Sequence, residues 1–183
     1  ENPNTVHCTG CPAIDLIDSL DLKMPDDLFS RYKGVGPDLD PKKPYLVVLQ
    51  HPVTTEYGSG FEQIQQTIRA VTRIGVQTVW LWPNVDAGSD DVSKGLRMFR
   101  ETQGPNNIHF YRNFSPDDYL RLIANCLCQV GNSSSALREG SFLGVPAVNI
   151  GTRQTGRECG ENVKHVGYSE SEIEQAVISQ IEY

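Results

Sequence analysis

Long apolar runs, a dense set of cysteines and an excess of basic charge are all absent from this sequence of 183 residues. No apolar run approaches the roughly 20 residues that span a bilayer, so we expect no membrane helix and no membrane partner. The 5 cysteines are too few, and odd in number, for a disulfide framework. No signal peptide is visible at Glu1–Asn4, so we expect reduced thiols in a cytoplasmic protein.

The formal net charge is −7 at pH 7. A general nucleic-acid binder needs a basic face against the phosphate backbone, so this balance argues against nucleic acid as a partner. It leaves room for a small anionic ligand, because a few arginines and backbone N–H groups can hold a phosphate on an acidic protein. The lone Cys8-Thr9-Gly10-Cys11 motif has only a poorly spaced second pair, Cys126 and Cys128. We therefore expect packing thiols, with no metal and no cofactor.

Two segments of different character meet near residue 44. Residues 1–44 are rich in proline and carry only short apolar pieces, which predicts a linker with short helices from an interdomain region. Residues 45–183 alternate strand-like and helix-like patterns about five times. Strands are predicted at 45–50, 76–81, 108–111, 128–131 and 145–150. Helices are predicted at 61–71, at 92–100, from Pro116 with Ser115 as N-cap, from the serines at 133–135 through Phe142, and at 170–181. This alternation predicts an α/β fold with a doubly wound parallel sheet of Rossmann-like type.

Polar segments follow each predicted strand. In a doubly wound sheet ligands bind outside the carboxyl ends of the strands, so these segments are expected to meet at one edge. They are His51–Glu56, Trp82–Ser89, Arg112–Phe114, Gly131–Ser135 and Gly151–Glu158. Their convergence predicts a small-molecule site.

Two of these segments, and the helix after one of them, carry groups suited to a nucleotide. Hydroxyl and N–H groups at Gly131-Asn132-Ser133-Ser134-Ser135 could hold a phosphate, and plain N-capping by one serine is the alternative. Glu139 could accept hydrogen bonds from ribose hydroxyls, or be a solvated residue in a helical first turn. Arg153, in a flexible loop, could contact a phosphate or form a surface ion pair.

His51 follows the most apolar predicted strand and precedes a proline, which keeps it out of helical geometry. A histidine at this place can bind a phosphate or act as an acid or base near neutral pH. The alternative is a loop histidine bonded to backbone.

Taken together, these segments resemble the UDP-N-acetylglucosamine 2-epimerase family. The resemblance rests on four pieces in the family's order: Gln50–Glu56, Pro83–Ser89, Gly131–Ser134 with Arg138 and Glu139, and Gly151–Gln154 with Gly156–Glu158. Non-hydrolysing members usually follow the first histidine with Arg-Arg-Glu-Asn. Here Pro-Val-Thr-Thr-Glu follows it, which resembles the hydrolysing, sialic-acid-pathway type.

The family fold implies two Rossmann-like domains facing a cleft, as in GT-B glycosyltransferases, and this chain resembles only the second half. Residues 45–183 would then be a UDP-binding domain truncated at its C-terminal helix, with the N-terminal Rossmann-like domain missing. The resemblance implies that His51 lies close to the departing diphosphate as the catalytic residue. It also implies that UDP or a UDP-sugar is bound at Asn84, Phe114, Ser133, Ser134, Glu139 and Arg153. Assembly of the full-length enzyme as a homo-oligomer stays open.

The implied reaction removes the proton at carbon 2 of UDP-N-acetylglucosamine and expels UDP. Water then adds to the glycal to give N-acetylmannosamine. The acidic residues that handle this proton lie on the first domain in the family, so we expect the chain alone to be inactive. Two alternatives stay open: a hydrolysing epimerase for another UDP-sugar, such as a diacetamido sugar, and a non-catalytic nucleotide-binding module.

Overall fold

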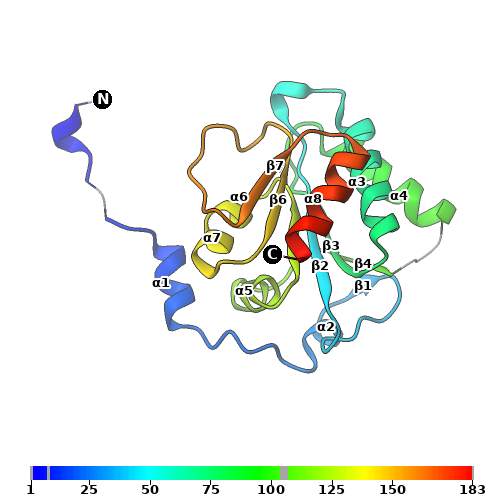
Figure 1. The fold of residues 1–183 in the computed structure, drawn as a ribbon, viewed down its shortest axis with the longest axis horizontal. Helices are drawn as coiled ribbons and strands as arrows, with labels where there is room; N and C mark the ends of the chain where they lie inside the picture. The colour runs from blue at the N-terminus through cyan, green and yellow to red at the C-terminus, as the bar shows by residue number, and fades with distance from the viewer. Residues whose placement is uncertain (1, 8, 104–106, 183) are drawn as a thin grey trace.

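The computed structural model describes residues 2–7, 9–103 and 107–182 (Figure 1). Glu1 and Cys8, named above, lie outside the described residues. The described chain forms a seven-stranded sheet in the order β1-β4-β3-β2-β5-β6-β7. The strands are β1 (Gly34–Val35), β2 (Tyr45–Leu49), β3 (Gln77–Leu81), β4 (Ile108–Tyr111), β5 (Cys128–Gly131), β6 (Ala147–Ile150) and β7 (Val163–Val166).

Eight α-helices lie in the described ranges. They are α1 (Pro12–Ser19), α2 (Leu28–Arg31), α3 (Gly60–Ile74), α4 (Ser89–Gln103), α5 (Pro116–Ala124), α6 (Ser134–Leu137), α7 (Glu139–Leu143) and α8 (Glu170–Ile181). Two short 3-10 turns lie at Pro3–Thr5 and Thr54–Glu56. Within these ranges, no helix is both long and apolar enough to cross a bilayer.

Helices cover both faces of the sheet (Figure 1). On one face, α3, α4 and α8 pack against strand residues such as Val48 and Trp80. On the other, α2 and α5 pack against the alternate residues, such as Val47 and Val79. The short helices α6 and α7 lie on this second side beside β6. All strand pairs are parallel except β1 with β4. The predicted α/β fold with a doubly wound sheet is therefore confirmed.

Local signals account for the main elements. Every residue from Tyr45 to Val48 is buried, as a strand covered on both faces requires. Helix α5 begins at Pro116, and the Ser115 side chain accepts a hydrogen bond from the Asp118 N–H (3.3 Å), so the predicted cap is confirmed.

The helix predicted from the serines at 133–135 through Phe142 is wrong in its continuity. The segment through Phe142 is not continuous but breaks at Arg138 into α6 and α7. The break lets α7 approach β5 closely at Gly140, where a Cβ would lie 2.5 Å from the Gln129 side chain. Because α6 has only four residues, its N-terminus offers the dipole of a single turn.

The edge strands β1 and β7 were not predicted. Strand β1 has only two residues, and β7 carries exposed Lys164 and His165 between two half-buried valines. Neither segment has the apolar run or the alternation by which strands are recognised. Residues before β2 also join the core, since Leu28 and Phe29 of α2 are buried.

The strand order reverses between β2 and β5. The chain runs from β2 outward through β3 to β4, and then returns to start β5 on the other side of β2. This is the point at which open α/β sheets form a crevice for ligands. Gly131 ends β5 there with φ +131°, and a Cβ on it would lie 2.1 Å from the Leu49 carbonyl oxygen. Only glycine fits this close approach of two backbones.

Candidate functional site

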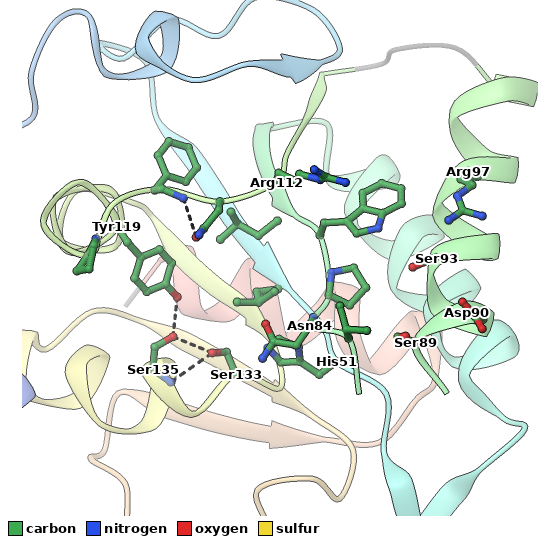
Figure 2. Close-up of a pocket in the computed structure, with 18 residues that line it drawn as sticks. His51, Asn84, Ser89, Asp90, Ser93, Arg97, Arg112, Tyr119, Ser133 and Ser135 are labelled. Atoms are coloured by element: carbon green, nitrogen blue, oxygen red, sulfur yellow. Dashed lines mark hydrogen bonds between the residues drawn. The ribbon is translucent and has the colours of Figure 1, made fainter. Parts of the chain in front are cut away.

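A cavity of about 970 Å³ lies at the carboxyl ends of the central strands (Figure 2). Its walls come from the segments after β2, β3, β4 and β5, and from α4 and α5. Four of the five strand-end segments thus meet as predicted. The polar and charged lining residues are His51, Asn84, Ser89, Asp90, Ser93, Arg97, Arg112, Asn113, Tyr119, Ser133 and Ser135.

His51 is held in place from two neighbouring strand ends. Its backbone N–H donates to Asn132 Oδ1 (2.7 Å), and Asn132 Nδ2 donates to its carbonyl oxygen (2.9 Å). The Asn84 backbone N–H donates to Nδ1 of the imidazole (3.2 Å). The neutral ring therefore carries its proton on Nε2.

The environment keeps this ring uncharged. Burial lowers the pKa of His51 to about 4, with a further contribution from the positive charge of Arg153 and a smaller opposing one from Asp86. At neutral pH the imidazole is therefore a hydrogen-bond donor through Nε2 rather than a cation. Such a group can stabilise negative charge in the cavity without transferring a proton.

The same shift makes stability depend on pH. Between pH 6.5 and 4 the unfolded chain binds a proton at His51 that the folded chain does not, so acid destabilises the fold. We expect this group to cost about 3 kcal/mol of unfolding free energy between pH 7 and pH 4. Urea titrations of the wild type and His51→Gln at both pH values measure the difference, with exposed His7→Gln as the control. An equal acid sensitivity of wild type and His51→Gln would contradict the lowered pKa.

Asn132 joins three strand ends. Besides its two bonds to His51, its own carbonyl accepts from Gln154 Nε2 (2.7 Å) and Arg153 Nη1 (3.3 Å) in the loop after β6. Asn132 is fully buried. Sequence reasoning placed it inside a phosphate-binding motif but gave it no role of its own.

A chain of hydroxyl groups lines the cavity and begins beside His51 (Figure 2). Ser133 Oγ lies 2.9 Å from Ser135 Oγ, which lies 2.6 Å from the Tyr119 hydroxyl. Ser133 is the N-cap of α6 and also accepts from the Ser135 N–H (3.3 Å). These three groups can donate to an anion. The sequence patterns described above do not point to Tyr119.

The remaining predicted residues divide between this cavity and its surroundings. Phe114 lines the cavity beside Arg112. Ser134 lines a second cavity. Glu139 is buried at the start of α7, where Oε1 accepts from Arg138 (2.7 Å) and Oε2 has no partner among the described residues. Arg153 Nη2 lies 3.6 Å from Asp86 Oδ2, and this ion pair connects the loop after β6 to the loop after β3.

Glu56 is a further residue that the sequence did not single out. Its carboxylate accepts hydrogen bonds from the hydroxyls of Thr152 and Tyr168 and from Gln63. The bond from Thr152 is the largest cause that lowers the pKa of Glu56, and those from Tyr168 and Gln63 act in the same direction. Glu56 thereby fixes the loop after β2 to the loop after β6, which carry His51 and Arg153.

A doubly wound sheet with a polar cavity at its switch point defines a Rossmann-like domain with a candidate ligand site. Residues 1–182 match the family model described as UDP-N-acetylglucosamine 2-epimerase, and the chain belongs to that family.

Curated relatives agree with this assignment. The chain is 27% identical over 177 residues to the UDP-N-acetylglucosamine 2-epimerase of Neisseria meningitidis, which covers 97% of the chain and 44% of the relative. It is 27% identical over 163 residues to a hydrolysing UDP-N,N'-diacetylbacillosamine 2-epimerase of Legionella pneumophila, which covers 89% of the chain and 41% of that relative. It is 29% identical over 185 residues to polysialic acid biosynthesis protein P7 of Escherichia coli, covering 100% and 45%. The chain thus spans less than half the length of these relatives.

Solved structures share the fold. The UDP-GlcNAc 2-epimerase of Methanocaldococcus jannaschii, in complex with UDP-GlcNAc and UDP, matches with a TM-score of 0.70 at 12% identity, over 100% of this chain and 50% of that one. The Escherichia coli ADP-heptose heptosyltransferase II matches with a TM-score of 0.58 at 12% identity, over 79% of this chain and 48% of that one. The chain therefore has the fold of one half of these larger proteins.

Proposed function

We propose that this chain is the nucleotide-binding half of a hydrolysing UDP-N-acetylglucosamine 2-epimerase. The observation that carries the proposal is the cavity of about 970 Å³ at the switch point, in a chain of the epimerase family. His51, Asn84, Phe114 and Ser133 all line it. The complete enzyme would convert UDP-N-acetylglucosamine and water to N-acetylmannosamine and UDP.

UDP would lie across the strand ends. Hydroxyl groups of Ser133, Ser135 and Tyr119, with backbone N–H groups near Ser134, would hold the diphosphate. Backbone near Phe114 would face uracil. The buried Oε2 of Glu139 lacks a donor among the described residues, and a ribose hydroxyl would supply one. Arg153 would add positive charge.

His51 would assist departure of the diphosphate. Once the proton at carbon 2 has been removed, negative charge develops on the diphosphate oxygen as the bond to carbon 1 breaks. The uncharged His51 ring donates from Nε2 to that oxygen, in a setting already fixed by Asn84 and Asn132. Water then adds to the glycal. Removal of the proton at carbon 2 would fall to acidic residues of a second Rossmann-like domain, so the chain alone would bind UDP and not turn over.

A specific relative favours a second candidate, a hydrolysing epimerase for a diacetamido UDP-sugar. The Legionella pneumophila relative carries that name. The UDP site would be the same, and the sugar would be chosen by groups on the other domain.

Calorimetric titration with UDP, with GDP and UMP as controls, tests the proposal. We expect selective binding of UDP that weakens about 10–100-fold in Glu139→Gln, since a hydrogen bond to a charged group is worth about 1.5–3 kcal/mol. Glu161→Gln is the matched control, because it makes the same change at an exposed side chain. Equal binding of the three nucleotides, or no binding by the folded chain, would contradict the proposal. Release of N-acetylmannosamine by this chain alone would contradict the need for a second domain.

A further inference from the structure

A second cavity of about 610 Å³ lies on the outer side of α6 and α7. It is lined by α1, α6, α7 and the loop between β6 and β7. Of its lining residues, the proposed function uses only Ser134, through backbone N–H groups. Two thiols line it, those of Cys11 and Cys159. Cys159 is exposed and Cys11 is half-buried, whereas Cys126 and Cys128 are buried. Burial raises the pKa of the Cys126 thiol and raises that of Cys128 to about 12, so both are inert.

Cys159 faces a histidine that a buried amide holds in place. Cys159 Sγ lies 3.5 Å from His165 Nε2, and His165 Nδ1 lies 3.0 Å from Nδ2 of the Asn149 side chain. The sheet register fixes this arrangement, because Asn149 of β6 and His165 of β7 are directly paired. The loop is anchored at its end, where the Gly160 N–H donates to Ser141 Oγ of α7 (2.8 Å).

The Asn149 amide is suited to orient the ring. Asn149 is 1% exposed, and its Oδ1 has no partner among the described residues. In the structure Nδ2 lies against Nδ1 of His165, and we take the amide turned by half a turn, so that Oδ1 accepts from the Nδ1–H of His165. Nε2 is then left free to accept the proton of the Cys159 thiol. A thiol, an imidazole base and an orienting amide are the groups that activate cysteine nucleophiles.

We propose that Cys159 is a reactive thiol that exchanges with small anionic disulfides of the glutathione type. His165 Nε2 takes the thiol proton, and the Cys159 sulfur attacks one sulfur of the disulfide. The disulfide bond breaks, and the departing thiolate takes the proton from His165. The products are a mixed disulfide on Cys159 and one free thiol, with the small disulfide as the only oxidant. Arg157 lines the same cavity and supplies a guanidinium for the carboxylates of the ligand.

The test treats the reduced chain with glutathione disulfide and follows each cysteine peptide by mass spectrometry after an acid quench. We expect Cys159 to form the mixed disulfide at least about tenfold faster than Cys11, and His165→Gln to remove about tenfold of the Cys159 rate. Lys164→Gln is the matched control, since it changes the neighbouring exposed cation on β7 and should leave the rate within about twofold. Equal rates at Cys11 and Cys159, or an unchanged rate in His165→Gln, would overturn the proposal.

Two further comparisons separate chemistry from folding. Asn149→Ala should slow the formation of the mixed disulfide at Cys159. Asn149→Asp, whose carboxylate can still accept from Nδ1 of His165, should restore the rate. Failure of this rescue would overturn the positioning role of Asn149. Arg157→Gln should slow exchange with glutathione disulfide and not with the neutral hydroxyethyl disulfide. Equal slowing with both disulfides would overturn recognition of the carboxylates. Thermal unfolding of each variant verifies that it is folded.

Discussion

Asn132→Ala is expected to lower the free energy of unfolding by about 2–5 kcal/mol, because it leaves two buried backbone groups of His51 unpaired. The measurement is urea unfolding followed by the fluorescence of buried Trp80. Under conditions where the variant is folded, UDP affinity should fall by more than tenfold, since the Asn132 side chain fixes the position of His51. The backbone carbonyl of residue 132, which accepts from Gln154 and Arg153, is kept in the variant.

Asn125→Ala is the matched control for this prediction. Its side chain also makes two hydrogen bonds, to the carbonyls of Leu22 and Arg121, but in an exposed setting. Water replaces such bonds, so its cost should stay below about 1 kcal/mol. Similar losses in the two variants would show that Asn132 does not join the strand ends as described.

Gly131→Ala should destabilise the protein by more than about 3 kcal/mol, or prevent folding. The new Cβ would have to displace the Leu49 carbonyl at the centre of the sheet, at a φ that side chains rarely adopt. Gly144→Ala separates the two causes, because Gly144 also has a positive φ of 68° but open space around it. That variant should lose only about 1–2 kcal/mol. Thermal unfolding of both proteins measures the difference, and equal losses would rule out a backbone collision at the switch point.

The central fold could be predicted because its signals are local. Buried strands such as β2 appear as continuous apolar runs, and Ser115 with Pro116 marks the start of α5. The break at Arg138 could not be predicted, because it depends on how closely Gly140 approaches Gln129 across the core. Strand β7 was missed because pairing with β6, rather than its own composition, makes it a strand.

Residues of the candidate site could be predicted only where their position directly after a strand was enough to identify them. His51 and Ser133 follow strands directly, and the sheet brings them to one cavity. Asn132 and Glu56 act through partners that lie far away in the sequence. Glu56, for example, meets Thr152 and Tyr168 about 100 residues later. Pattern reasoning on a single sequence has no access to such pairs.

Strand β2 is the middle strand of seven, with three strands on each side. The backbone that carries His51 therefore exchanges its amide hydrogens only when most of the sheet opens, whereas β7 at the edge can fray locally. The two thiol partners Cys159 and His165 lie at this edge. Brief opening events at the edge would thus separate the Cys159 thiol from the His165 ring while the proposed nucleotide site, at the centre, stays assembled.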